Sequence, residues 1–184
     1  EIYCSSNKIK EIPVQIKQLK NLRHLSCSNN ELKEIPAWIK DLKNLQQFYC
    51  YGNLITFLPY EIAELTNLQE FDCSFNQLKE IPTWIKDLKN LRKFDCSANE
   101  IDHLLSEIGQ LNNLRDFNCS HNLIRKIVPE IGNLSNLEEL SFHANKITQI
   151  PFEITRCQQL CYFSYRDNET DVLNPAVERF VNRL

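Results

Sequence analysis

Short runs of alternating apolar and polar residues recur along this chain at a fixed interval. In one such run, Phe71 and Cys73 alternate with Glu70 and Asp72. This is the period-two pattern of a strand that buries one face and exposes the other. Each run therefore predicts a short, half-buried strand.

A second kind of segment follows each strand. Ile85 and Leu88 lie three residues apart, which places both on the inner side of a short helix or 3₁₀ turn. Proline suits the first turn of such a helix, where its missing N–H has no cost. In two units Leu105 and Val128 replace this proline, and we expect a more extended or irregular segment there. Five units carry Ile-Pro or Leu-Pro before the helical turn, at Pro13, Pro36, Pro59, Pro82 and Pro151.

The interval is 23 residues over the length of the chain. A period of this size predicts a solenoid, in which each unit stacks on its neighbours. We expect about eight parallel strands, the first near residues 2–4. The period is carried by asparagines at Asn7, Asn30, Asn53, Asn76, Asn99, Asn122, Asn145 and Asn168, and by cysteines at Cys4, Cys27, Cys50, Cys73, Cys96 and Cys119.

Superposing the units gives L-x-x-F-x-C-S-x-N-x-I-x-x-I-P-x-x-I-x-x-L-x-N, as in residues 68–90. The pattern resembles the leucine-rich repeat, with its L-x-x-L-x-L-x-x-N core, over nearly the whole chain. Its second half resembles the 23-residue class found in bacterial, notably spirochaete, proteins and in plant intracellular Ras-group relatives. The resemblance implies a right-handed α/β solenoid with a concave parallel sheet and short helices or 3₁₀ turns on the convex side. It also implies that the asparagines form a ladder, bonding loop backbone of their own and the next turn.

The pattern stops near the C-terminus. Asn174-Pro175 is a favourable helix start. An apolar stripe follows it, at Val177, Phe180, Val181 and Leu184. We therefore divide the chain into repeats over residues 1–168, with partial first and last units, and a capping helix over 169–184. No comparable cap precedes residue 1, which predicts a raw N-terminal sheet edge.

Eight cysteines suggest disulfides at first sight. Six of them occupy one inward position in successive parallel strands, where neighbouring Cβ atoms lie near the ~4.8 Å strand spacing. That exceeds the ~3.8 Å mean of a disulfide, so we predict six reduced, buried thiols that act as small apolar side chains. Cys157 replaces a core leucine. Cys161, at a strand position with partial exposure, is the thiol that we expect to be reactive.

Composition excludes several classes of protein. The 184 residues are 42% hydrophobic and 24% charged, with a net charge of −3. This is a globular composition, and without a basic block nucleic acid is a poor candidate partner. No apolar run approaches the ~18 residues of a membrane span. The chain contains no methionine and starts inside a repeat, so we expect a trimmed form whose leader is missing.

No catalytic motif is evident, and we predict that the chain is not an enzyme. Three glycines leave no phosphate-binding loop. Of the four histidines, His121 and His143 are the pair that adjacent turns bring close. With Asp116 and Glu139 they form at most a chance cation site. We expect no cofactor and no metal.

The residues that alternate with the core differ from unit to unit and form the concave face. They combine aromatic side chains with an acidic stripe, which resembles a protein-interaction surface. The candidate binding residues are Tyr49, Tyr51, Glu70, Asp72, Phe75, Lys93, Asp95, Asp116, Asn118 and Glu139.

The convex side offers an alternative. Trp38, Tyr60 and Trp84 occupy equivalent positions in consecutive units. They are either partly buried helix aromatics or a strip for self-association, and the raw N-terminal edge is another candidate for self-association.

Three functions remain open. We favour a bacterial recognition module, secreted or on the cell surface, that contacts a host or envelope protein through the concave face. The second is an intracellular scaffold or effector that uses the same face. The third is the recognition part of a larger enzyme whose catalytic domain is absent.

Overall fold

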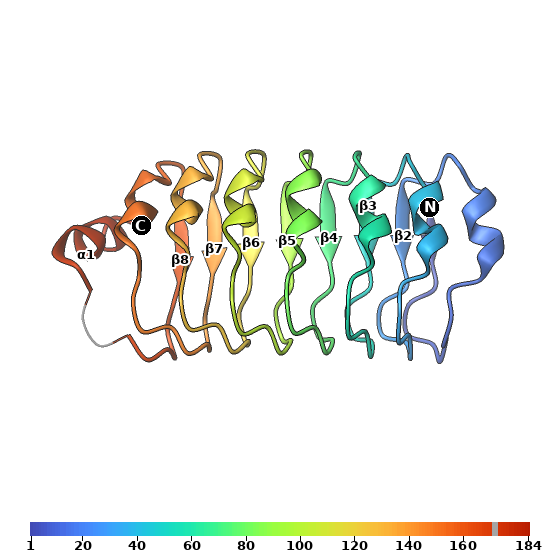
Figure 1. Cartoon of the computed structure of the whole chain (residues 1–184), viewed down its shortest axis with the longest axis horizontal. Coiled ribbons are helices and arrows are strands. Elements are labelled where there is room, and N and C mark those ends of the chain that lie inside the picture. Colours follow the sequence, from blue (N-terminus) through green and yellow to red (C-terminus); the bar gives the residue numbers. More distant parts are fainter. Residues whose placement is uncertain (171–172) are drawn as a thin grey trace.

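The computed structural model describes residues 1–170 and 173–184 and shows one elongated stack of repeats (Figure 1). Within these residues a single eight-stranded parallel sheet runs in chain order from β1 to β8. Each residue pairs with the residue 23 positions along, as Phe48 pairs with Phe71. The predicted period, strand number and first strand are therefore confirmed. The strands are β1 (Ile2–Tyr3), β2 (His24–Ser26), β3 (Gln47–Tyr49), β4 (Glu70–Asp72), β5 (Lys93–Asp95), β6 (Asp116–Asn118), β7 (Glu139–Ser141) and β8 (Tyr162–Ser164).

A 3₁₀ helix follows each of the first seven strands, on the side of the molecule opposite the sheet (Figure 1). The residue before each helix is extended, as at Pro36 with φ −70° and ψ 144°. Proline presets this φ but is not required for it. The helices are η1 (Val14–Gln18), η2 (Ala37–Asp41), η3 (Tyr60–Glu64), η4 (Thr83–Asp87), η5 (Ser106–Gln110), η6 (Pro129–Asn133) and η7 (Phe152–Arg156).

The expectation of irregular segments after Leu105 and Val128 is wrong. Val128 has φ −72° and ψ 143°, the same conformation as the prolines, and η6 follows it. Leu105 likewise precedes η5. Glycine contributes to the packing here, since a Cβ at Gly109 would lie 2.4 Å from the backbone oxygen of Glu130. Close helix stacking supports both units, and in η6 a proline one position later, Pro129, occupies the first helical residue.

The core lies between the sheet and the 3₁₀ helices. The rings of Phe48, Phe71, Phe94 and Phe117 stack along it with centroids 5.6–5.7 Å apart. In the next unit Leu140 and Phe142 replace a phenylalanine and a cysteine, and both are fully buried. The large and small residues exchange positions, so the layer keeps its volume.

The asparagine ladder joins each unit to its neighbour. The Asn76 Nδ2 atom donates to the carbonyls of Cys73 and Ser74 in its own turn and of Cys50 in the preceding unit, at 3.0–3.1 Å. Its Oδ1 atom accepts from the Ile55 N–H at 2.9 Å. The ladder that the resemblance implied is present, but it reaches back to the preceding unit rather than on to the next.

All eight cysteines are unpaired. Cys27, Cys50, Cys73, Cys96 and Cys119 are buried, and Cys161 is exposed, as predicted. The prediction of a buried thiol is wrong for Cys4, which is only partly buried. Cys4 follows the edge strand β1, so a neighbouring unit covers it on one side only.

The C-terminal helix α1 (Pro175–Val181) begins at Asn174, whose side chain accepts a hydrogen bond from the Ala176 N–H at 2.9 Å. Val177 and Phe180 are buried, and α1 packs beside η7 at the end of the stack (Figure 1). Part of the segment that we assigned to the cap, 171–172, lies outside the described residues.

The convex aromatic residues do not form a continuous strip. Trp84 is 7% exposed and belongs to the core, and Trp38 packs partly buried against the same core. Tyr60 is 64% exposed. The two tryptophans are therefore buried or partly buried helix aromatics, which was the first of the two interpretations, and they do not form a strip for self-association.

The ladder predicts an unequal cost of removing asparagines. We expect Asn76→Ala to lower the free energy of unfolding by about 3 kcal/mol, because it leaves buried donors and acceptors unpaired. Asn7→Ala should cost less than about 1 kcal/mol, since Asn7 is exposed and bonds only Cys4 and Ser5 of its own turn. Chemical denaturation of both variants tests this. Equal losses would contradict the ladder's role.

Thiol labelling should separate the cysteines into classes. Burial raises the pKa of the Cys50 and Cys73 thiols well above the ordinary value and that of Cys157 to about 11. Because the thiolate is the reactive form, we expect native-state alkylation to modify Cys161 first and Cys4 more slowly. Mass spectrometry should find the other six modified only after unfolding. Rapid native labelling of Cys73 would contradict this prediction.

Candidate functional site

Two adjacent hollows lie on the exposed face of the sheet. The first, of about 390 Å³, spans strands β1 to β5 and has aromatic walls. We call it the aromatic hollow. Its size falls within the ~300–1,000 Å³ of ligand pockets. It is lined by Tyr3, His24, Ser26, Tyr49, Tyr51, Glu70, Phe71, Asp72 and Lys93.

The second hollow, of about 290 Å³, continues from the first across β5 to β8. We call it the acidic hollow. Lys93 lines both hollows, so the two form one continuous surface. The acidic hollow is lined by Lys93, Asp95, Asp116, Asn118, Glu139, Leu140, Ser141 and Tyr162.

The structure brings together nine of the ten candidate binding residues. Phe75 is the exception, because it lines neither hollow. It lies in the turn after β4 with φ 51° and is 64% exposed. This left-handed conformation recurs at the matching position of every unit, as at Ala98 and His121, so the repeat imposes it.

The candidate residues leave out five lining residues of the exposed face: Tyr3, His24, Ser26, Ser141 and Tyr162. The signal was available, because His24 and Tyr162 occupy the strand position of Glu70, and Tyr3 and Ser26 that of Asp72. The candidate residues lie in the middle units, whereas these residues lie towards the two ends of the sheet.

A chain of side-chain hydrogen bonds fixes the wall of the aromatic hollow. Glu70 accepts from the Tyr49 hydroxyl and, at 2.9 Å, from the Gln47 amide Nε2. The Gln47 Oε1 atom therefore points to His24 Nδ1, 2.7 Å away. Since an amide oxygen only accepts, Nδ1 carries the proton. In the neutral ring, Nε2 is then an acceptor, and this buried atom has no partner among residues 1–170 and 173–184.

Matched carboxylates in the two hollows differ in their hydrogen bonds. Asp95 uses both oxygens: Oδ1 accepts from Ser97, and Oδ2 accepts from Asn118 Nδ2 at 2.9 Å. Asp72 uses Oδ1 in the same way, accepting from the Ser74 N–H at 3.0 Å and its hydroxyl at 2.6 Å. Its Oδ2 atom has no partner within the described residues. Burial raises the pKa of Asp72, against the lowering effect of the Ser74 hydrogen bonds.

The basic side chain of this surface is engaged within the acidic hollow. Lys93 Nζ lies 2.8 Å from Asp116 Oδ2, and this contact holds the pKa of Lys93 above its usual range. The ammonium group of Lys93 thus mainly neutralises the negative charge of Asp116, in the acidic hollow. The carboxylates of the aromatic hollow keep more of their negative potential.

The histidine pair forms no metal site. His121 and His143 have ring centroids 5.0 Å apart, and His143 Nδ1 lies 3.5 Å from Asp167. Asp116 and Glu139, the other members of the conceivable cation site, line the acidic hollow instead. Within residues 1–170 and 173–184, no group of three His, Cys, Asp or Glu side chains is placed to hold a metal ion.

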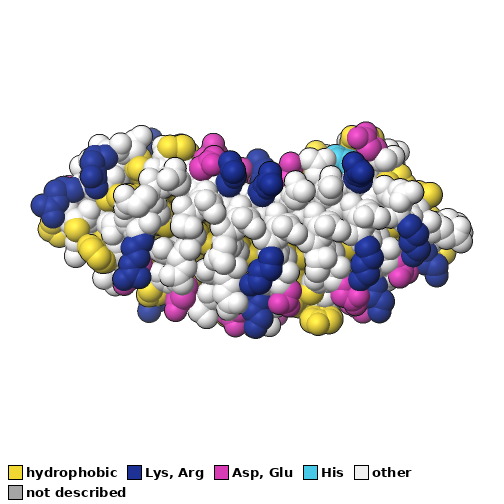
Figure 2. Space-filling view, turned by 90° about the horizontal axis from the view of Figure 1, so that it is seen from above, with side chains coloured by type: hydrophobic (Ala, Val, Ile, Leu, Met, Phe, Trp, Pro, Cys, Tyr) yellow, Lys and Arg dark blue, Asp and Glu magenta, His cyan; other side chains and the backbone are white. Residues whose placement is uncertain are grey.

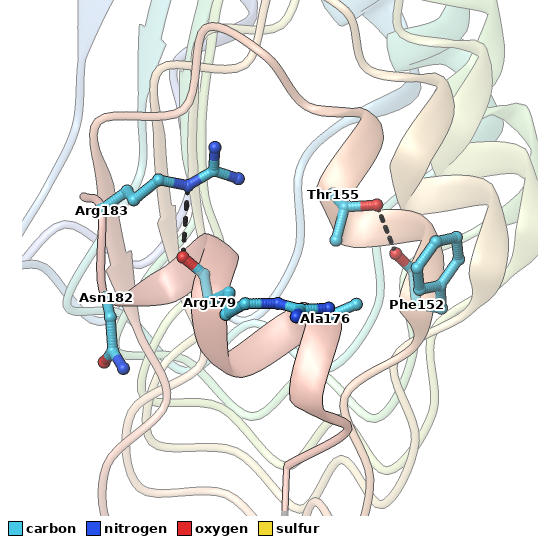
Figure 3. Close-up of a pocket in the computed structure, with 6 residues that line it drawn as sticks. All are labelled: Phe152, Thr155, Ala176, Arg179, Asn182 and Arg183. Carbon is cyan, nitrogen blue, oxygen red and sulfur yellow. Dashed lines mark hydrogen bonds between the residues drawn. The ribbon is translucent and has the colours of Figure 1, made fainter.

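A third hollow, of about 600 Å³, lies between η7 and α1 (Figure 3). Phe152 and Thr155 line one side, and Arg179, Asn182 and Arg183 the other. Arg183 Nε donates to the Arg179 carbonyl at 3.2 Å. The polar side chains that line this third hollow converge on no common point. The sheet face is therefore the better candidate site.

The surface charges are dispersed. Viewed from above the stack, basic and acidic side chains mix along both long margins (Figure 2). No block of one sign covers this view. Of the helices in the described part of the chain, none has the length and apolar character needed to cross a bilayer.

The chain belongs to the leucine-rich repeat family. The family model described as a leucine-rich repeat region matches residues 3–104, and a model of two leucine-rich repeats matches 112–153. No curated protein matches significantly.

Solved structures agree with this assignment. A leucine-rich repeat protein of Leptospira interrogans is 36% identical over 95% of the chain, with a TM-score of 0.92. The chain spans 45% of that protein's length. The plant peptide hormone receptor RGFR1, in complex with RGF2, is 27% identical over 95% of this chain and 33% of the receptor, with a TM-score of 0.79. Internalin C2 of Listeria monocytogenes, at 21% identity over 98% of this chain and 76% of its own, shares the fold with a TM-score of 0.85.

The half-buried position of Asp72 predicts an abnormal titration. Because its pKa is raised in the folded state, folding penalises the ionised form, and the penalty is relieved as pH falls through the folded pKa. We expect the carboxyl carbon of Asp72 to titrate by NMR above the ordinary value of 3.8. Asp72→Asn should be most stabilising, relative to the native chain, above that midpoint. A midpoint at or below 3.8 would contradict the effect of burial.

Proposed function

We propose that this chain is a protein-recognition module that binds a partner through the two hollows of its sheet face. The observation that carries the proposal is that nine variable residues, half-buried or exposed, form one continuous surface over a scaffold whose inner positions repeat. Tyrosine and carboxylate side chains gathered in one place are typical of interaction hot spots.

The relatives support a binding role. The plant peptide hormone receptor RGFR1, which shares this fold, was solved in complex with RGF2. A fold of this class supplies a rigid surface, and the partner is determined by the residues displayed on it. We propose that the chain itself has no catalytic activity and that its partner is a protein.

The finer proposal is a bacterial protein, secreted or on the cell surface, that contacts a host or envelope protein. The 36% identity to a Leptospira protein supports a bacterial origin. The alternatives are an intracellular scaffold and the recognition part of a larger enzyme. The complete gene separates the three: a leader sequence supports the first, its absence the second, and a catalytic domain the third.

Alanine substitutions test the binding face. With a partner obtained by crosslinking and pull-down, Tyr49→Ala and Tyr51→Ala should each weaken binding by about 1–2 kcal/mol, or roughly tenfold. Tyr60→Ala, an exposed tyrosine on the opposite side, is the matched control and should leave affinity unchanged. Thermal unfolding should show that the fold of all three variants is intact. Normal binding by both sheet-face variants, measured by calorimetry, would place the site elsewhere.

A further inference from the structure

The aromatic hollow has the chemistry of a receptor for a positively charged, planar group. Tyr3, Tyr49 and Tyr51 supply ring surfaces, and Glu70 and Asp72 supply negative charge. Tyrosine faces attract cations through their quadrupole. A hollow of about 390 Å³ can take one long side chain of a partner.

Two acceptors in this hollow lack a donor. Asp72 Oδ2 has no partner within the described residues, whereas the matched oxygen of Asp95 is occupied by Asn118. His24 is 9% exposed, and its Nε2 atom has no partner in the described part of the chain. The wall around them is held in place by the bonds from Tyr49 and Gln47 to Glu70. A ligand rich in N–H groups can donate to Asp72 Oδ2 from within the hollow, whereas His24 Nε2 is closed off from solvent by its neighbours.

The positive charges nearest the hollow do not fill this role. Lys93 is drawn to Asp116 at 2.8 Å. The His24 Nδ1 proton is directed to Gln47. The hollow therefore retains two carboxylates, one of them with an unused oxygen, beside the exposed ring of Tyr3, which lies 4.5 Å from the His24 ring.

We propose that the aromatic hollow binds an arginine side chain of the protein partner, with the guanidinium group between the tyrosine rings and Asp72. Arginine fits better than lysine because its planar group stacks on aromatic rings and presents five N–H donors in a fixed fork. This inference rests on the proposed function, since it names the type of partner side chain that the sheet face recognises.

The test uses blocked amino acids as probes of the ¹⁵N-labelled chain. N-acetyl-arginine methylamide, added to tens of millimolar at about 0.15 M salt to screen distant charges, should shift the amide signals of Tyr51 and Asp72 with saturation. The lysine analogue should bind more weakly. The citrulline analogue, which keeps the shape without the charge, should cause no saturating shift.

Asp72→Asn and Asp95→Asn form a matched pair, one strand apart. Asp72→Asn should lower the affinity for the arginine probe about fivefold or more. Asp95→Asn should keep that affinity within about twofold of the unsubstituted chain's. Dispersed amide spectra establish that both variants are folded. Both variants keep an acceptor oxygen for the neighbouring serine.

Several results would overturn the inference. These are equal binding of citrulline and arginine, tighter binding of lysine, shifts confined to the acidic hollow, no saturating shift at all, or equal effects of the two asparagine variants. If these occur while Tyr49→Ala and Tyr51→Ala still weaken the natural partner, the recognition function stands and the arginine assignment falls. If the tyrosine variants also bind normally, the sheet-face function falls as well.

Discussion

The structure depends on the pairing of buried turn backbone by asparagine. Each unit must leave its strand through a tight turn inside the stack, where water cannot satisfy the carbonyl and amide groups. One asparagine side chain has two donor hydrogens and an acceptor. Asn76 uses them on both its own turn and the preceding unit. The same side chain therefore closes the turn and fixes the distance between units. The parallel register of 23 residues and the stacked phenylalanines follow from it.

This construction separates stability from recognition. The inward strand positions hold phenylalanine and cysteine, and the asparagines lie behind them in the turns. The outward positions contribute little to the core and can differ from unit to unit. Strand β4 shows both roles: Phe71 packs in the core on one face, and Glu70 and Asp72 stand on the binding face opposite. A rigid inner layer then holds the outer side chains at a fixed spacing, which lowers the entropy lost when a partner binds.

The exposed face is not uniform along the stack. From Asp95 onward, neighbouring strands satisfy each other, as Asn118 does for Asp95 and Lys93 for Asp116. Towards the N-terminus, Gln47 and Tyr49 satisfy Glu70 in the same way, but Asp72 keeps an oxygen that no described residue occupies. Asp72 and Asp95 occupy the same position in neighbouring strands. Asp95 is paired within the protein, whereas Asp72 has an oxygen free to bind a ligand. This difference, rather than the number of acidic residues, distinguishes the aromatic hollow from the acidic one.

The sequence by itself determined the period, the strand positions, the unpaired cysteines and most of the sheet-face residues, because a strict repeat converts residue numbers into neighbours. It did not determine the conformation of the two units that lack proline before the helix. There η5 forms without a proline, supported by packing at Gly109, and η6 has its proline one position later, at Pro129. Three-dimensional contacts alone decided that Trp84 is buried, that Cys4 is half-exposed at the sheet edge and that Phe75 stands apart from the hollows. They also decided which carboxylate keeps a free oxygen. Such properties depend on how completely each side chain is surrounded, and a repeat pattern gives the order of neighbours but not their distances.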